Sequence, residues 1–113
     1  MFIPGKGILC YKFVTTKNYF MVDIRTIHII VSGKVQGVYF RASCVDTARK
    51  LGIGGWVRNM PDNRVEIMAS GGAKEMDEFI KWCRLGPSGA QVDEVLVEEK
   101  AFQSFENFTI LRG

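Results

Sequence analysis

The chain has 113 residues, of which 47% are hydrophobic and 24% are charged, a composition that fits one globular domain with a single core. Its formal net charge is +3, and no basic cluster stands out after residue 24, which argues against a nucleic-acid-binding surface. No apolar run approaches the roughly 20 residues needed to span a membrane. The three cysteines are widely spaced and form no C-x-x-C pair, so we expect reduced thiols and a cytoplasmic protein.

Residues 1–20 differ in pattern from the rest of the chain, because their aromatic residues and lysines follow no clear period. Met21 directly precedes the first well-patterned strand. We therefore interpret residues 1–20 as an N-terminal extension of unknown role and residues 21–113 as the folded domain. The same interpretation makes Met21 the hypothetical native start.

From Arg25 onward, the hydrophobic periodicity predicts strands and helices separated by clear glycine and proline signals. The expected elements are a strand over 25–32, a helix over 40–51, strands over 53–59 and 65–70, a helix over 73–85, and strands over 91–99 and 105–111. Val92 falls out of phase with Val95 and Val97, which indicates a β-bulge. The order β-α-β-β-α-β-β predicts an α+β fold, a ferredoxin-like two-layer sandwich in which a five-stranded sheet carries both helices on one face.

The stretch from Gly33 to Arg41 connects the first of these strands to the first helix. A short glycine-containing loop before a helix turns backbone N–H groups inward, and the helix start adds unpaired donors and the positive end of its dipole. Such a nest binds anions, and Arg41 adds a planar fork of N–H donors that suits a tetrahedral oxyanion. We predict that this loop holds a phosphoryl group.

Asn59 closes the strand expected over 53–59. A strand–helix–strand crossover makes the two strands parallel, so their carboxyl ends lie at the same end of the sheet. A helix of about twelve residues retraces about 18 Å, close to the length of a six-residue strand. We therefore expect Asn59 to lie near the loop and Arg41.

The sequence offers few parts for covalent or metal-assisted catalysis. His28 is the only histidine and lies in mid-strand, and Cys44 falls where the helix is expected to bury a small residue. What remains is hydrolysis by positioning and electrostatics, in which Arg41 and the loop bind phosphoryl oxygens and the Asn59 carbonyl orients a water. Because a neutral amide is a poor base, the substrate needs a good leaving group, as in a mixed carboxylic–phosphoric anhydride.

Residues 33–41 resemble the G-x-V-Q-G-V-x-F-R motif of the acylphosphatase family, and residues 55–59 resemble its G-x-V-x-N motif. Residues 86–95 are similar to a third stretch of that family. The resemblance implies hydrolysis of acyl phosphates to a carboxylate and inorganic phosphate, without metal or cofactor. It implies that Asn59 positions the nucleophilic water and that Arg41 completes the phosphate site. The phosphate-binding residues that it implies are Gly33, Lys34, Val35, Gln36, Gly37, Val38 and Arg41.

Two departures from the family pattern concern the expected site. Met60 stands where many members have a threonine after the asparagine. The family commonly ends Phe-x-Ile-Arg, whereas here Leu111 separates Ile110 from Arg112. Neither departure touches the two expected catalytic positions.

Two alternatives stay open. The same fold can serve as a binding module that recognises RNA or a protein through its sheet, but this use calls for exposed aromatic residues and a basic surface. Residues 25–113 are nearly neutral, which argues against it. The other alternative is a domain that acts on carbamoyl phosphate. We expect a monomer whose partners are the small-molecule substrate, water and inorganic phosphate.

Overall fold

The computed structural model describes the backbone of residues 8–14 and 19–112 and the side chains of residues 23–112. Its elements, in chain order, are β1 (Ile8–Val14), β2 (Tyr19–Lys34), α1 (Phe40–Lys50), β3 (Gly54–Asn59), β4 (Val65–Gly72), α2 (Ala73–Leu85), β5 (Gln91–Lys100) and β6 (Phe108–Ile110). Within these ranges, neither helix has the length and the apolar character needed to cross a membrane.

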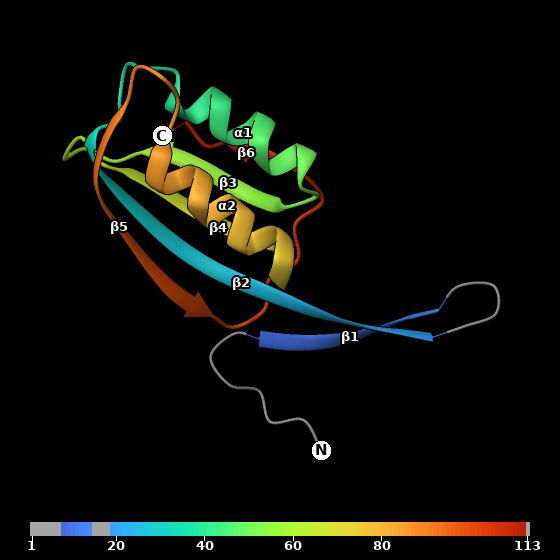
Figure 1. Cartoon of the computed structure of the whole chain (residues 1–113). Helices are drawn as coiled ribbons and strands as arrows, with labels where there is room; N and C mark the ends of the chain where they lie inside the picture. The colour runs from blue at the N-terminus through green and yellow to red at the C-terminus, as the bar shows by residue number, and fades with distance from the viewer. Residues whose placement is uncertain (1–7, 15–18, 113) are drawn as a thin grey trace.

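The sheet has the strand order β5-β2-β4-β3-β6, and both helices pack on one of its faces (Figure 1). All neighbouring strands are antiparallel except β3 and β6, which run parallel. The predicted α+β, ferredoxin-like sandwich is therefore confirmed. A sixth strand, β1, joins this sheet by pairing with the first part of β2, and the two form an arm that extends beyond the sandwich (Figure 1).

The core lies between the sheet and the two helices. Alternate residues of β2, namely Ile27, Ile29 and Val31, have no exposed surface and face the helices. Phe40 from α1 and Phe79 from α2 pack against them and are 1% and 0% exposed. Each such side chain contributes about 1.5–3 kcal/mol by its burial, so this two-layer packing holds the ends of the strands in place.

Several predicted strand limits are wrong, among them the three that follow. The strand expected over 25–32 is the sixteen-residue β2, because its first part finds a partner in β1. The strand expected over 105–111 is only β6, which pairs with β3 through three residues. Ile53 lies before β3 rather than in it. In each case pairing between strands, rather than local residue pattern, sets the limit.

The predicted bulge in β5 is confirmed. Ser32 of β2 lies opposite Glu94, but the next residue, Gly33, lies opposite Val92, so the register passes over Asp93. A bulge bends its strand and increases the local twist. Here it lies beside Gly33, where the loop to α1 begins.

Candidate active site

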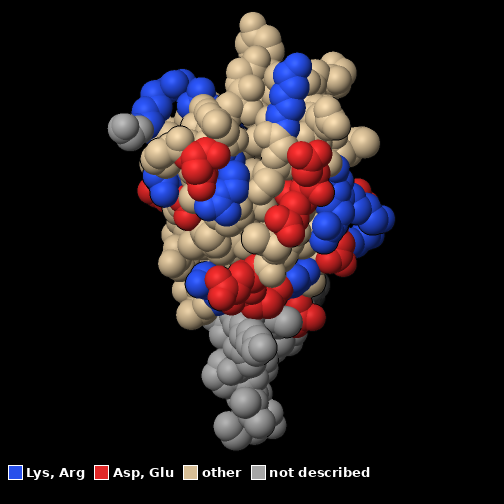
Figure 2. All heavy atoms as spheres, turned by 90° about the vertical axis from the view of Figure 1, so that its left-hand side faces the viewer, with Lys and Arg blue, Asp and Glu red and all other residues tan. Residues whose placement is uncertain are grey.

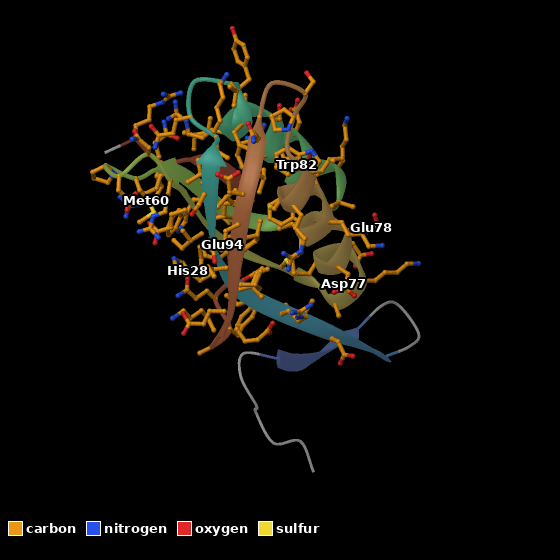
Figure 3. All side chains as sticks on the ribbon, turned by 60° about the vertical axis from the view of Figure 1, so that its left-hand side comes forward. His28, Met60, Asp77, Glu78, Trp82 and Glu94 are labelled. Atoms are coloured by element: carbon orange, nitrogen blue, oxygen red, sulfur yellow. The ribbon has the colours of Figure 1, made fainter. Side chains whose placement is uncertain are left out.

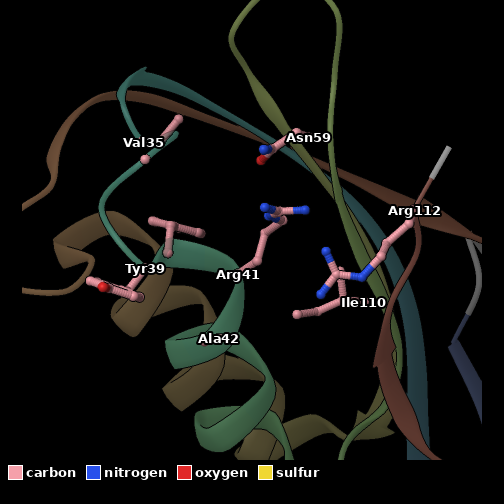
Figure 4. A pocket seen from close by; sticks show the side chains of 9 residues that line it. Val35, Tyr39, Arg41, Ala42, Asn59, Ile110 and Arg112 are labelled. Atoms are coloured by element: carbon pink, nitrogen blue, oxygen red, sulfur yellow. The ribbon is translucent and has the colours of Figure 1, made fainter.

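A cavity of about 400 Å³ opens at the end of the sheet where β2 and β3 finish (Figure 4). The lining residues are Val35, Gly37, Tyr39, Phe40, Arg41, Ala42, Asn59, Ile110 and Arg112. They come from the β2–α1 loop, the start of α1, the end of β3, and the segment from β6 onward. Arg41 and Asn59, expected to be neighbours, line this one cavity.

The crossover explains why Arg41 and Asn59 meet. β2 and β3 are both antiparallel to β4, which lies between them, so they run in the same direction and end at the same end of the sheet. Arg41 is in the first turn of α1, which follows β2, and Asn59 is the last residue of β3. The side chains of both residues extend into the cavity (Figure 4).

The end of β2 and the loop between β2 and α1 have an unusual backbone. Gly33 has φ 124°, and a Cβ placed there would lie 2.2 Å from the carbonyl oxygen of Gln91. Gly37 has φ 74°, and Tyr39, which precedes α1, has φ 61° although it carries a bulky side chain. Left-handed conformations in non-glycine residues are strained and concentrate at functional sites.

The backbone N–H groups of residues 36–39 are available to a ligand, since none of them donates a hydrogen bond to a group that the structure describes. The first turn of α1 contains no acidic residue, and no side chain caps its N-terminus. Unpaired N–H groups and an uncapped helix start together make a region of positive potential. The loop can therefore accept an anion.

Arg41 and Asn59 each bring an unused polar group to the cavity. The Arg41 guanidinium has no hydrogen bond or ion pair to any described residue. Asn59 Oδ1 is buried and, among the described side chains, has no hydrogen-bond partner. A buried carbonyl oxygen without a donor costs free energy unless a ligand or water supplies one. Chemically, this arrangement can hold an anion beside an acceptor for a water proton.

Gln36 fastens the loop to the turn that follows β3. Its Nε2 donates hydrogen bonds of 2.9 Å to the carbonyl oxygens of both Met60 and Arg64. The side chain thus binds the hairpin directly after Asn59, and Gln36 is not among the described residues that line the cavity. This contact sets the position of the loop relative to Asn59.

The structure divides the predicted phosphate-binding residues into two groups. Val35, Gly37 and Arg41 line the cavity. The other predicted residues, Gly33, Lys34, Gln36 and Val38, are absent from its lining, and Lys34 is exposed. Of these, Gly33 allows close approach to Gln91, and Gln36 holds the loop by its hydrogen bonds to Met60 and Arg64.

Sequence reasoning missed Arg112 as a site residue. Arg112 and Ile110 both line the cavity. The available signal was the shifted end of the chain, where Leu111 separates Ile110 from Arg112. That shift does not place the Arg112 side chain, because β6 ends at Ile110 and the packing of the last residues decides where it lies.

His28 and Cys44 lie outside the site, as expected. His28 Nε2 is 2.6 Å from Glu66 Oε2, on the side of the sheet opposite α2 (Figure 3). Cys44 is fully buried in the core, and burial raises the pKa of its thiol well above the usual value. Neither side chain can serve as base or nucleophile in the cavity.

Charges on the surface are mixed in sign. Figure 2 shows basic and acidic side chains interspersed on the face it displays, without a continuous basic patch. The open side of the sheet likewise carries Glu66 between His28 and Arg58. These charges give no support to a general RNA-binding surface.

The acylphosphatase family model matches residues 27–110. An acylphosphatase from Marinobacter nauticus is 54% identical over 82 residues, covering 72% of this chain and 89% of the relative. An acylphosphatase from Methylococcus capsulatus is 46% identical over 90 residues, covering 79% and 98%. The solved structure of an acylphosphatase from Coxiella burnetii superimposes with a TM-score of 0.76 at 36% identity, covering 78% of this chain and 93% of that one. With the motif-bearing loop, the cavity and nearly the whole folded part matched, the chain belongs to the acylphosphatase family.

Proposed function

We propose that this acylphosphatase cleaves the carboxyl–phosphate bond by direct attack of a water that Asn59 positions. The loop N–H groups and Arg41 bind the phosphoryl oxygens, and their donors are oriented before the substrate arrives. Donors fixed in advance stabilise the charge of the transition state without reorganisation. The meeting of Arg41, Asn59 and the loop in one cavity carries this proposal.

Asn59 acts through its side-chain carbonyl oxygen. Because Oδ1 has no partner among the described residues, it is free to accept a hydrogen bond from water. An amide aligns that water but is too weak a base to deprotonate it, so the reaction requires a good leaving group. A carboxylate leaves an acyl phosphate without protonation, which restricts the substrates to activated phosphates.

Hydrolysis of benzoyl phosphate by the full chain tests the proposal. We expect turnover at the same rate with and without a chelator, and competitive inhibition by inorganic phosphate. Circular dichroism establishes that the protein assayed is folded. Folded protein without turnover would overturn the proposal, and loss of turnover in chelator would overturn the metal-independent mechanism. Carbamoyl phosphate is assayed in parallel, and comparison of the two rates distinguishes a carbamoyl-phosphate-hydrolysing domain from a hydrolase of acyl phosphates in general.

A further inference from the structure

The active-site cavity contains a second guanidinium group. Arg112 lines it together with Arg41, and the two side chains reach into it from different elements (Figure 4). Like Arg41, Arg112 makes no hydrogen bond or ion pair with any described residue. Among the described residues that line the cavity, none carries a carboxylate. Arg112 is exposed to solvent, so water screens the repulsion between the two guanidinium groups and leaves both able to pair with an anion.

Arg112 stands where the cavity meets an adjoining hollow. Ala42, Ile110 and Arg112 also line this second space of about 380 Å³, which follows the seam between α1 and β6. Its other charged residues are Asp46 and Arg49, one of each sign. Arg112 therefore provides the excess positive charge at the junction.

The phosphoryl group already has its donors in Arg41 and the loop. A substrate seated there still has its acyl portion to place, and the adjoining hollow is the space next to the cavity that shares its walls. A group leaving the cavity by that route passes Arg112. A guanidinium pairs well with a planar or tetrahedral oxyanion, through two parallel N–H···O bonds.

We infer that Arg112 is a specificity-determining residue that selects acyl phosphates bearing a second oxyanion on the acyl portion, such as a terminal carboxylate. The inference rests on the proposed function, since it assigns the phosphoryl group to Arg41 and the loop. Arg112 and Ile110 line both the cavity and the adjoining hollow, which puts the guanidinium where such an oxyanion would pass.

Two substrates of equal length separate the acyl contact from the phosphoryl contact. Succinyl phosphate carries a terminal carboxylate, and butyryl phosphate carries a methyl group in its place. We expect Arg112→Ala to lower kcat/KM for succinyl phosphate by about tenfold more than for butyryl phosphate, mainly through KM. Arg112→Lys restores part of the preference. Arg84→Ala removes an equal charge from the exposed side of α2 and controls for net charge.

Binding of the matching phosphonates, in which a methylene group replaces the bridging oxygen, gives a readout independent of turnover. Wild-type protein is expected to bind the carboxylated phosphonate more tightly, and Arg112→Ala to lose that advantage. Equal losses for both ligands, or no change for either, would overturn the inference. Selective binding without any turnover would uphold it as a binding role and overturn the proposed hydrolysis instead.

Discussion

Arg41 occupies a position that electrostatics alone disfavours. It lies in the first turn of α1, where the helix dipole attracts anions and repels cations. The Arg41 guanidinium has no counter-ion among the described residues. In the proposed mechanism, a bound phosphoryl group would offset both the charge of this guanidinium and the positive end of the helix dipole. Asn59 plays the complementary part, since its unpaired oxygen faces the same cavity.

Replacing these two residues separates binding from chemistry. Arg41→Ala is expected to raise the Kd for inorganic phosphate and to lower kcat/KM by about a thousandfold, because it removes charge-assisted hydrogen bonds in both ground and transition states. Asn59→Ala is expected to lower kcat by about a hundredfold with little change in KM. Steady-state kinetics and phosphate binding measure both effects.

Matched variants make the comparison specific. Arg41→Lys keeps the charge but not the planar fork, so it recovers only part of the activity. Cys44→Ala, one turn further along the same helix and buried in the core, is expected to retain turnover. Wild-type activity in either the Arg41 or the Asn59 variant would contradict the assigned roles.

The β2–α1 loop is fastened on two sides, and this fastening operates at the level of whole elements. On one side Gly33 lets the loop pass close to Gln91 of β5. On the other side the Gln36 amide holds the β3–β4 turn. These two contacts therefore set where the N–H groups of residues 36–39 lie relative to Asn59, although no hydrogen bond that the structure describes joins the loop to Asn59 directly.

Gly33, near the end of β2, and Gly37, in the loop that follows, should respond differently to substitution by alanine. At Gly33 the added Cβ meets backbone that cannot move aside, so we expect the free energy of unfolding to fall by about 3 kcal/mol. At Gly37 no described atom beyond the two chain neighbours lies within 4 Å of the added Cβ, so only the cost of the left-handed backbone, about 1–2 kcal/mol, remains. Urea denaturation measures both variants, and equal losses would refute the distinction.

Gln36 is a positioning residue in this arrangement. Gln36→Ala removes two hydrogen bonds and is expected to cost about 2 kcal/mol of stability and to raise KM by about tenfold. Gln36→Glu is expected to be worse, because a carboxylate would face the two carbonyl oxygens of Met60 and Arg64. Kinetics and thermal unfolding test this order, and a Glu variant as active and stable as wild type would disprove the tether.

At the scale of the whole molecule, charged side chains link neighbouring strands on the face of the sheet that the helices leave uncovered. Glu66 of β4 bonds both His28 of β2 and Arg58 of β3, and so joins three strands. Burial raises the pKa of the Glu66 carboxyl, but its hydrogen bonds with His28 and Arg58 outweigh burial and bring the pKa below its usual value.

A pKa that is lower in the folded state makes stability depend on pH. The ionised Glu66 carboxylate stabilises the folded state fully above about pH 4.5, the pKa of this carboxyl in an unfolded chain. This stabilisation is lost as the pH falls through the lower pKa of the folded state. We expect the free energy of unfolding of wild type to fall with acid in this range, and Glu66→Gln to show a shallower fall. Asp62→Asn, in an exposed pair with Arg64, should change the slope less. Identical pH profiles for wild type and Glu66→Gln would rule out this role.

The local residue pattern was sufficient to predict much of the fold, and it also predicted that Arg41 and Asn59 lie in the site. The alternation of Ile27, Ile29 and Val31 is a short-range signal, and so is the helical spacing of Met76, Phe79 and Cys83 in α2. Burial on one face followed from both directly. The crossover rule likewise brought Asn59 to Arg41, because chain direction is a property of element order. The pairing of residues 8–14 with β2 had no such signal, since a strand partner is chosen by a non-local contact.

The amino-acid sequence determined the element order, the loop proposed to bind an anion and the identity of the two groups expected to act beside it, because these depend on residue type and on spacing along the chain. Only the tertiary structure decided that Gln36 turns from the nest to the hairpin and that Arg112 shares a cavity with Arg41. Both depend on which surfaces meet when the strands, α1 and β6 pack together. That packing decides which groups a side chain contacts, and the hydrophobic periodicity of the sequence does not predict it.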